Sequence, residues 1–378
     1  MAETQMPKTL RALLAQLDEQ GIHDHRRYER IRTFLNFKAR DKGVPISGSF
    51  ELTPLCNLDC KMCYVHLNKE QMKGAQLLTT EQWKDIMQQA IDAGMMYARM
   101  TGGECLTYPG FKELYLFLRE KGIEVSILSN GLLMNEEMVG FLRENPPAGV
   151  QVTLYGASDE GYERVTGQRA FGTVAKNLHR LKEAEIPLTI AVTPNVYMTD
   201  GEEILHWLHE NGFPYQINSG LMAPREETGR ETGDAPLDVY VRLMKLQRAQ
   251  AGQETVPYPD PEGLPEPGGR TEDALCGVSC GAGRSTFSVD WQGGMRPCNT
   301  FPCEPQSVFR LGFAEAWKRT RRIADGMARP AECEACAYKG NCKHCVSEHA
   351  AGAEIGHASP VICAWRKRMA IEGLLKQS

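Results

Sequence analysis

The sequence of 378 residues has no strong excess of charge of either sign and no long apolar run. Its formal net charge is −5, and the acidic and basic residues are interspersed, which argues against nucleic-acid binding. The first residues lack the apolar core of a signal peptide, and no run approaches the length of a membrane span. We therefore expect a cytoplasmic protein with no nucleic-acid and no membrane partner.

Cysteine, in contrast, is abundant, with 13 in the chain. In a reducing compartment so many cysteines are more often metal ligands than disulfides. Three of them lie between residues 56 and 63, and nine lie after residue 275. The distribution predicts metal sites near the front and near the end of the chain.

Between residues 46 and 252, short apolar runs alternate with amphipathic helical patterns. Such alternation is typical of parallel βαβ units. Six units predict an α/β fold, a partial (β/α)6 TIM-like barrel whose chemistry lies at the C-terminal ends of its strands. The expected strands are Gly48–Leu52, Met96–Met100, Glu124–Leu128, Val150–Leu154, Leu188–Val192 and Tyr215–Asn218; the expected helices are Thr80–Ala93, Phe111–Lys121, Glu136–Glu144, Phe171–Ala184, Glu202–Asn211 and Leu237–Ala251.

The ends of the chain differ in character from this repeat. Two short amphipathic helices, Thr9–Glu19 and Arg26–Lys38, are expected before it. After a run rich in Pro and Gly, clear periodicity is lost and cysteine density rises, so metal would have to hold this region together. A last amphipathic helix is expected at about Ala364–Lys376. The predicted division is a helical cap (1–45), the barrel (46–252), a linker (253–273), a cysteine-rich domain (274–363) and a C-terminal helix (364–378).

The first cysteine group has the order Cys56-x3-Cys60-x2-Cys63 and follows the first predicted strand. Thiolates select iron–sulfur clusters and zinc. A closed structural site normally uses four protein ligands, whereas a reactive site keeps one position open, so a group of three is informative. The spacing resembles the signature of the radical S-adenosylmethionine (SAM) superfamily, in which three cysteines hold a [4Fe–4S] cluster and SAM binds the fourth iron. A zinc loop completed by His66 and a set of scattered buried thiols remain the alternatives.

Further resemblance to this superfamily lies where later strands end. Gly102, Gly103 and Glu104 resemble the motif that binds the amino group of SAM, and glycines let a ligand approach the backbone closely. Ser129 and Asn130 resemble the segment that contacts the ribose and carboxylate of SAM. Without the resemblance, both segments would be interpreted as ordinary turns.

The resemblance extends to four further residues and departs at one. Thr153 and Arg164 correspond to the hydroxyl and guanidinium that contact SAM, and Met62 and Tyr64 lie where the family contacts adenine. Cys105 stands where the family usually has Pro. Its thiol is either a hydrogen-atom donor or a small buried side chain.

The C-terminal cysteines resemble a SPASM domain, which carries auxiliary [4Fe–4S] clusters. The resemblance implies two clusters with interleaved ligands, and leaves Cys303 outside both groups. Only two residues separate the ligands at 342 and 345, where the family usually has three, so His344 is an alternative ligand, and two zinc sites remain open as well. The implied ligands are Cys276, Cys280, Cys298 and Cys345 for the first cluster, and Cys333, Cys336, Cys342 and Cys363 for the second.

The resemblance implies an enzyme with three [4Fe–4S] clusters and SAM, reduced by a flavodoxin or ferredoxin. It would take a hydrogen atom from a ribosomally made peptide and install a cross-link or an oxidation. Oxidation of a protein side chain, as in anaerobic sulfatase maturases, is a second possibility, although Asn299 stands where those enzymes have an acidic base. Peptide epimerisation, small-molecule dehydrogenation and a non-catalytic electron-transfer scaffold are further alternatives.

Overall fold

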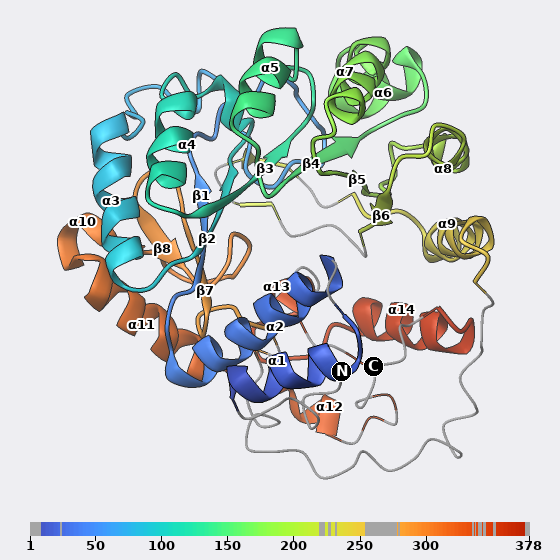
Figure 1. Cartoon of the computed structure of the whole chain (residues 1–378). Coiled ribbons are helices and arrows are strands. Elements are labelled where there is room, and N and C mark those ends of the chain that lie inside the picture. The colour runs from blue at the N-terminus through green and yellow to red at the C-terminus, as the bar shows by residue number, and fades with distance from the viewer. Residues whose placement is uncertain are drawn as a thin grey trace.

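The computed structural model describes residues 9–22, 25–218, 224–225, 228–230, 233–253, 278, 280–334, 336, 338, 342, 345–350 and 353–374. Six parallel strands form the predicted partial barrel, which is thereby confirmed, and they lie at the centre of the molecule (Figure 1). Their order is β6-β5-β4-β3-β2-β1, and the sheet continues beyond β1 as β7-β8-β9. The parallel strands are β1 (Ser47–Glu51), β2 (Tyr97–Thr101), β3 (Glu124–Ser129), β4 (Gly149–Leu154), β5 (Leu188–Val192) and β6 (Tyr215–Ile217).

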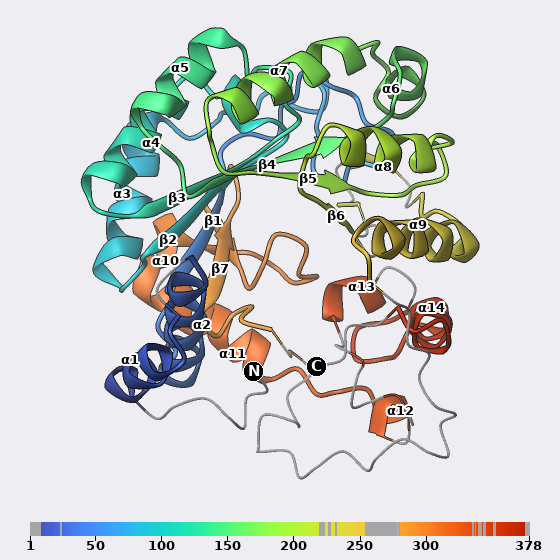
Figure 2. The same ribbon diagram turned by 45° about the vertical axis from the view of Figure 1, so that its right-hand side comes forward.

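Helices cover the outer face of these strands in an arc from α3 round to α9 (Figure 2). Each turns an apolar face to the sheet, and side chains such as Trp83, Leu114 and Leu178 are fully buried there. Burial of these faces is the main force that holds the layers together. The sequence did not predict α6. The helices are α3 (Thr80–Asp92), α4 (Phe111–Glu120), α5 (Glu136–Glu144), α6 (Asp159–Thr166), α7 (Phe171–Glu183), α8 (Gly201–Glu210) and α9 (Leu237–Gln250).

A local sequence signal, the capping box formed by Thr79 and Gln82, explains where α3 begins. The Thr79 hydroxyl accepts from the Gln82 amide at 3.2 Å, and the Gln82 side chain accepts from the Thr79 amide at 2.9 Å. This capping box satisfies backbone donors that have no partner within the helix. It fixes the start of α3 at Thr80.

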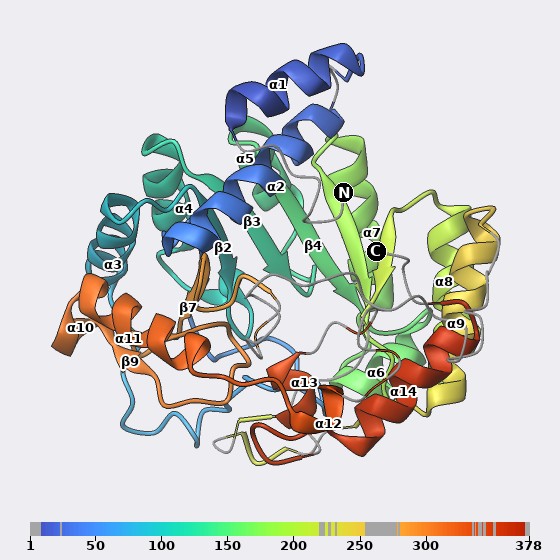
Figure 3. The ribbon, with the colours of Figure 1, turned by 90° about the horizontal axis from the view of Figure 1, so that it is seen from below.

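The C-terminal region extends the sheet rather than leaving it. β7 (Thr286–Val289) pairs in parallel with β1, and β8 (Gly294–Arg296) and β9 (Gln306–Ser307) continue as antiparallel strands. After the short α10 (Val308–Leu311), α11 (Phe313–Asp325) runs beside α3 (Figure 3). The expectation that periodicity is lost in this region is therefore wrong. Helix α11 buries one face at three- and four-residue steps, formed by Phe313, Ala316, Trp317, Thr320 and Ala324.

Both ends of the chain pack on this framework. The two expected N-terminal helices are present as α1 (Leu10–Glu19) and α2 (His25–Lys42). The last helix, α14, is Pro360–Ile371 rather than Ala364–Lys376, because Ser359 caps its start by accepting from the Ile362 amide. It packs on α9, where Arg248 donates to the Gly373 carbonyl at 2.5 Å. The remaining short helices are η2 (Cys105–Thr107), α12 (Ala331–Glu334) and α13 (Val346–Ala350).

The predicted linker lies almost wholly within residues 254–277, which are outside the described residues. The domain boundaries placed there stay predictions. In the part of the chain that the structure describes, no helix is both long and apolar enough to cross a membrane.

Phe287 of β7 joins the barrel to the C-terminal strands. Its ring centroid lies 5.9 Å from that of Phe50 on β1 and 5.1 Å from that of Phe313 on α11. We expect Phe287→Ala to lower the free energy of unfolding by about 3–5 kcal/mol, because it leaves a cavity in a packed core. Phe309→Ala, at a side chain that is 46% exposed, should cost far less. Urea unfolding followed by circular dichroism measures both, and equal losses would contradict this role of Phe287.

Candidate functional site

The residues predicted to hold the cofactors lie at the C-terminal ends of β1 to β4. The cysteine loop, residues Leu52–Thr79, follows β1, and Gly102 to Glu104 follow β2. The hydrogen-bond ladder between these two strands continues beyond them into the loop. Gly103 donates to the Thr53 carbonyl at 2.7 Å, and Glu104 donates to the Leu55 carbonyl at 2.9 Å. The cysteine loop is therefore fixed at its root by main-chain bonds.

This close approach requires glycine at both positions. A Cβ atom on Gly103 would lie 2.4 Å from the Leu55 carbonyl oxygen, and one on Gly102 would lie 2.5 Å from that of Thr53. Gly102 also has a φ of 156°. Real Cβ atoms do not approach backbone oxygens so closely, so the two glycines are needed for the loop alone, before any ligand is considered.

Glu104 connects the ends of β2 and β3. One carboxylate oxygen accepts from the Ser129 hydroxyl at 3.0 Å and the Asn130 amide at 2.7 Å. The other accepts from the Leu106 amide at 3.1 Å and lies 3.8 Å from the Cys105 sulfur. Burial raises the pKa of this carboxyl group, although these hydrogen bonds oppose the shift. A neighbouring cation would stabilise such a buried carboxylate, and the oxygen with the long contact to sulfur retains the capacity to accept from it.

The structure brings the three cysteines of the loop together. Burial raises the pKa of Cys56 to about 12, with a further contribution from Cys63. It raises the pKa of Cys60 well above its usual value, and both other thiols add to that shift. Asn130 links this group to Glu104, because its side-chain amide donates to the Cys56 sulfur at 3.6 Å and to Asn57 at 2.7 Å. Three neighbouring thiols, of which Cys60 is buried and the other two are partly buried, are a donor set for an iron–sulfur cluster.

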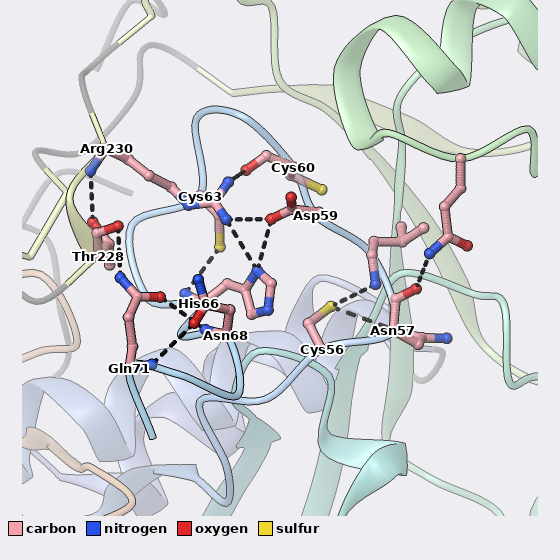
Figure 4. Close-up of polar contacts among 12 residues, drawn as sticks. Cys56, Asn57, Asp59, Cys60, Cys63, His66, Asn68, Gln71, Thr228 and Arg230 are labelled. Atoms are coloured by element: carbon pink, nitrogen blue, oxygen red, sulfur yellow. Dashed lines mark hydrogen bonds and ion pairs between the residues drawn. The ribbon is translucent and has the colours of Figure 1, made fainter. Parts of the chain in front are cut away.

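The opposite side of the cysteine loop is held by polar contacts (Figure 4). The His66 ring nitrogen Nδ1 lies 3.2 Å from Arg230 and 3.3 Å from Asp59. Nδ1 therefore already has two polar partners, the Arg230 guanidinium and the Asp59 carboxylate. Within the described residues, no group of three or more Cys, His, Asp or Glu is arranged around a single metal ion. The engagement of His66 favours a cluster on three cysteines over a zinc loop that His66 completes.

The other predicted SAM contacts lie around this centre but with partners of their own. Met62 is buried in the main core. Burial raises the pKa of Tyr64 to about 12, and its side chain contacts Asn299. Thr153 lies at the end of β4, whereas Arg164 on α6 pairs with Asp200 at 3.7 Å and is 43% exposed. Their contacts with SAM stay predictions.

Cys105 is fully buried behind this site. Its thiol donates to the Leu128 carbonyl at 3.3 Å, and burial raises its pKa well above the usual value. Both observations favour a packing role, and the role of hydrogen-atom donor stays a prediction.

The described C-terminal cysteines lie near one another in two groups, and their assignment to two sets of cluster ligands stays a prediction. Cys298 contributes to the raised pKa values of Cys280 and Cys345, so these three thiols are neighbours. Cys303, which the sequence left outside both sets, also lies near Cys298. The predicted ligands at positions 276 and 344 lie outside the described residues. In the second group, Cys336 contributes to the raised pKa values of Cys333, Cys342 and Cys363, for which burial is the main cause, so these four thiols are neighbours as well.

Two arginines that the sequence reasoning missed complete the site. Arg225 forms a two-pronged ion pair with the buried Glu51, at 2.7 and 2.9 Å, and donates to the Asn299 carbonyl at 3.0 Å. Arg230 contacts the cysteine loop. Both follow β6, and a charged residue after a predicted barrel strand was the one available signal.

Comparison with known proteins agrees with this geometry. A family model described as Radical SAM superfamily matches residues 50–208, which contain the cysteine loop and the ends of β2 to β4. This part of the chain is a radical SAM domain. It holds the three neighbouring thiols, the close backbone approach and the buried carboxylate described above.

Three curated proteins are similar to the chain. The sporulation killing factor maturation protein SkfB of Bacillus subtilis is 28% identical over 54% of this chain and 49% of its own length. The antilisterial bacteriocin subtilosin biosynthesis protein AlbA of the same organism is 23% identical over 88% of this chain and 74% of its own. The AdoMet-dependent heme synthase of Methanosarcina barkeri is 24% identical over 79% of this chain and 90% of its own length. The match thus spans only about half of SkfB.

Solved structures share the fold beyond the radical SAM domain. Streptococcus suis SuiB bound to S-adenosylmethionine superposes with a TM-score of 0.67 at 16% identity, covering 93% of this chain and 87% of that one. SuiB has also been solved bound to the precursor peptide SuiA, with a TM-score of 0.66. The protein anSMEcpe with bound AdoMet and a peptide superposes with a TM-score of 0.64 at 17% identity, covering 85% of this chain and 94% of that one. At these identities the likeness shows the fold alone.

Gly103→Ala tests the close approach of the two segments. The added methyl group must displace the Leu55 carbonyl, so we expect the iron bound after anaerobic reconstitution to fall by the share of the one cluster that this loop is predicted to hold. Gly140→Ala is the matched control, because nothing lies within 4 Å of that helical position. The control should stabilise the protein by about 1 kcal/mol and keep its iron. Full iron content in Gly103→Ala would contradict the role of this contact.

Cys105→Ala separates packing from chemistry. If the thiol only fills the core, the variant loses about 1 kcal/mol of stability and keeps both SAM cleavage and substrate turnover. If the thiol donates a hydrogen atom, SAM cleavage continues while product formation stops. Chromatography of 5′-deoxyadenosine and mass spectrometry of the product distinguish the two results, and the buried geometry leads us to expect the first.

Proposed function

We infer that this protein is a radical SAM enzyme that modifies a ribosomally synthesised peptide. The observation that carries the inference is the group of three neighbouring thiols at the end of β1, connected through Asn130 to the Glu104 carboxylate within the radical SAM domain. Cys56, Cys60 and Cys63 would hold a [4Fe–4S] cluster with SAM on its open iron, and this group would supply the 5′-deoxyadenosyl radical chemistry that removes a hydrogen atom from the substrate.

The residues of the chain position these groups and keep water out. The main-chain bonds at Thr53 and Leu55 fix the start of the cysteine loop against β2. Asn130 donates to the Cys56 sulfur, a contact of the kind that stabilises a thiolate. Glu104 is 1% exposed, so a SAM ammonium held against it would be shielded from solvent. A preorganised site of this kind restricts which hydrogen atom a reactive radical can reach.

A peptide is the substrate that the relatives support best. SkfB and AlbA are named for the maturation or biosynthesis of a killing factor and a bacteriocin, and SuiB binds a precursor peptide. The expected product carries a cross-link, such as a thioether or a carbon–carbon bond, or an oxidation. Epimerisation of a residue remains an alternative that leaves the mass unchanged.

Two other substrate classes are less well supported. An anaerobic sulfatase-maturase-like oxidation needs a base next to Cys298, where this chain has Asn299. The Asn299 carbonyl accepts from Arg225, and its side chain contacts Tyr64, so the residue is used structurally. An amide takes no proton at neutral pH. Dehydrogenation of a small molecule is kept as an alternative, because one relative is named a heme synthase.

We assign the two C-terminal cysteine groups to auxiliary [4Fe–4S] clusters, three clusters in all. Clusters ligated by four cysteines offer no free iron to a substrate, so their proposed role is to accept the electron that bond formation leaves behind. A flavodoxin or ferredoxin would reduce the first cluster. The abundance of cysteine supports a location in the reducing cytoplasm, where thiols remain available as metal ligands.

Two measurements test the proposal. Reduced protein incubated with SAM alone should form 5′-deoxyadenosine, and Cys60→Ala should abolish this because the group of three thiols is then incomplete. Lys69→Ala, an exposed change in the same loop, should not alter it. Mass spectrometry of a peptide encoded beside the gene, after co-expression, should show the loss of two hydrogens.

The possible results separate the alternatives. An absence of 5′-deoxyadenosine above background would favour the electron-transfer scaffold and contradict the proposal. SAM cleavage combined with an unchanged peptide mass and unchanged stereochemistry would retain the radical chemistry but remove the peptide substrate.

A further inference from the structure

Arg230 contacts three residues of the cysteine loop from a segment more than 160 positions further along the chain. One terminal nitrogen donates to the Cys60 carbonyl, and the other donates to the Asp59 carboxylate and lies 3.2 Å from His66 Nδ1 (Figure 4). The guanidinium therefore binds the main chain at a predicted cluster ligand.

Neighbouring contacts hold the segment of Arg230 against the same loop. The Arg225 amide donates to the Tyr64 carbonyl at 3.2 Å. The Gln71 side chain donates to the Thr228 carbonyl at 3.1 Å. In the loop sequence, Tyr64 lies between the Arg230 contacts at Cys60 and His66, and Gln71 lies after them. The position of the guanidinium is thus determined by several bonds and not by one flexible side chain.

The ion pair of Arg230 with Asp59 is asymmetric. The Arg230 side chain is 16% exposed, whereas the Asp59 side chain is 69% exposed. Water screens the exposed carboxylate more than it screens the buried guanidinium. The main chain at Cys60, which the guanidinium contacts, therefore lies next to a net positive charge, although the pair is formally neutral.

A positive charge at this place has a defined effect on an iron–sulfur cluster. The reduction potential of such a cluster depends on its net charge, on hydrogen bonds and on its exposure to solvent. Reduction adds one negative charge, which a fixed guanidinium stabilises. A cation held beside the loop therefore raises the reduction potential of the cluster bound there.

We propose that Arg230 is a positioning residue that holds the Cys60 segment and raises the reduction potential of the cluster on Cys56, Cys60 and Cys63. Asp59 opposes this effect by partly neutralising the guanidinium. The pair thereby sets how easily the electron donor can reduce the cluster. This inference rests on the proposed function, because it requires a cluster in the cysteine loop.

The test compares two variants of the full-length, reconstituted protein that change the pair in opposite directions. Arg230→Gln removes the positive charge and keeps a hydrogen-bond donor. It should decrease the reduced-to-oxidised ratio at a fixed potential by about tenfold, equivalent to about 59 mV for one electron. Asp59→Asn removes the negative charge from an exposed position and should increase the ratio. The measurement is a redox titration of the electron paramagnetic resonance signal that changes when SAM is added.

Two further variants serve as controls. Arg230→Lys keeps the charge and should restore most of the potential. Arg169→Gln changes an exposed arginine that pairs with Glu160 and Glu163 on α6, away from the loop, and should cause no shift. Iron analysis of each variant shows how much cluster the measured signal represents.

The outcomes are distinguishable. Opposite shifts for Arg230→Gln and Asp59→Asn support the proposal. Shifts of the same sign, or none in Asp59→Asn, overturn it and leave Arg230 with a purely structural role. A wild-type protein without a SAM-sensitive signal would contradict the proposed function itself, before the variants are compared.

Discussion

The contact between the cysteine loop and the backbone of Gly102 to Glu104 is the constraint on which the site depends. Two main-chain hydrogen bonds extend the pairing of β1 and β2 beyond the strands, and both glycines are needed for the chains to come so close. The contact places the buried carboxylate of Glu104 beside the loop. From there the carboxylate binds the end of β3, and Asn130 at that end reaches back to Cys56. The donor set is therefore assembled by the sheet.

Two buried carboxylates near the cysteine loop have partners of different charge. The two buried carboxylates, Glu51 and Glu104, are stabilised differently, one by Arg225 and the other by neutral donors only. Burial raises the pKa of Glu104, and no arginine is among the groups that oppose the shift. A buried carboxylate held by neutral donors retains an unmet preference for a cation. The ammonium group of SAM would supply that cation, whereas the cation of Arg230 is committed to the opposite side of the loop.

Elements with a clear period and the local motifs could be predicted from the sequence. The six parallel strands and their helices follow from alternating apolar runs, and three closely spaced cysteines indicate a candidate metal site, which the family resemblance makes an iron–sulfur site. Helix α11 was equally predictable, since its apolar residues recur at helical spacing, although it lies in a region of high cysteine density. The pairing of β7 with β1 could not be predicted, because strands of two to four residues carry too little pattern to identify a partner.

The arginines of the site were beyond sequence reasoning for a different reason. Arg225 and Arg230 lie in a segment without periodicity, and their partners lie more than 160 positions earlier. Nothing in the local sequence distinguishes an arginine that pairs with a buried carboxylate from one that faces solvent. The fold alone brings the ends of β1 and β6 together, so such pairs can be recognised only after the barrel is built.

The pair of Glu51 and Arg225 also shows how the C-terminal region is attached to the barrel. Such a buried ion pair contributes little net stability compared with well-packed apolar side chains, because both charges must leave water. The pair matters here because its hydrogen bonds hold the guanidinium in one orientation. The guanidinium is fixed by Glu51 at the end of β1, and its remaining donor capacity reaches the carbonyl of Asn299, the residue next to Cys298. The same strand thus leads into the cysteine loop and anchors the first C-terminal cysteine group. A protein that passes an electron between two metal sites needs their relative position to be fixed, and an ion pair with directional bonds fixes it better than an apolar contact of the same area.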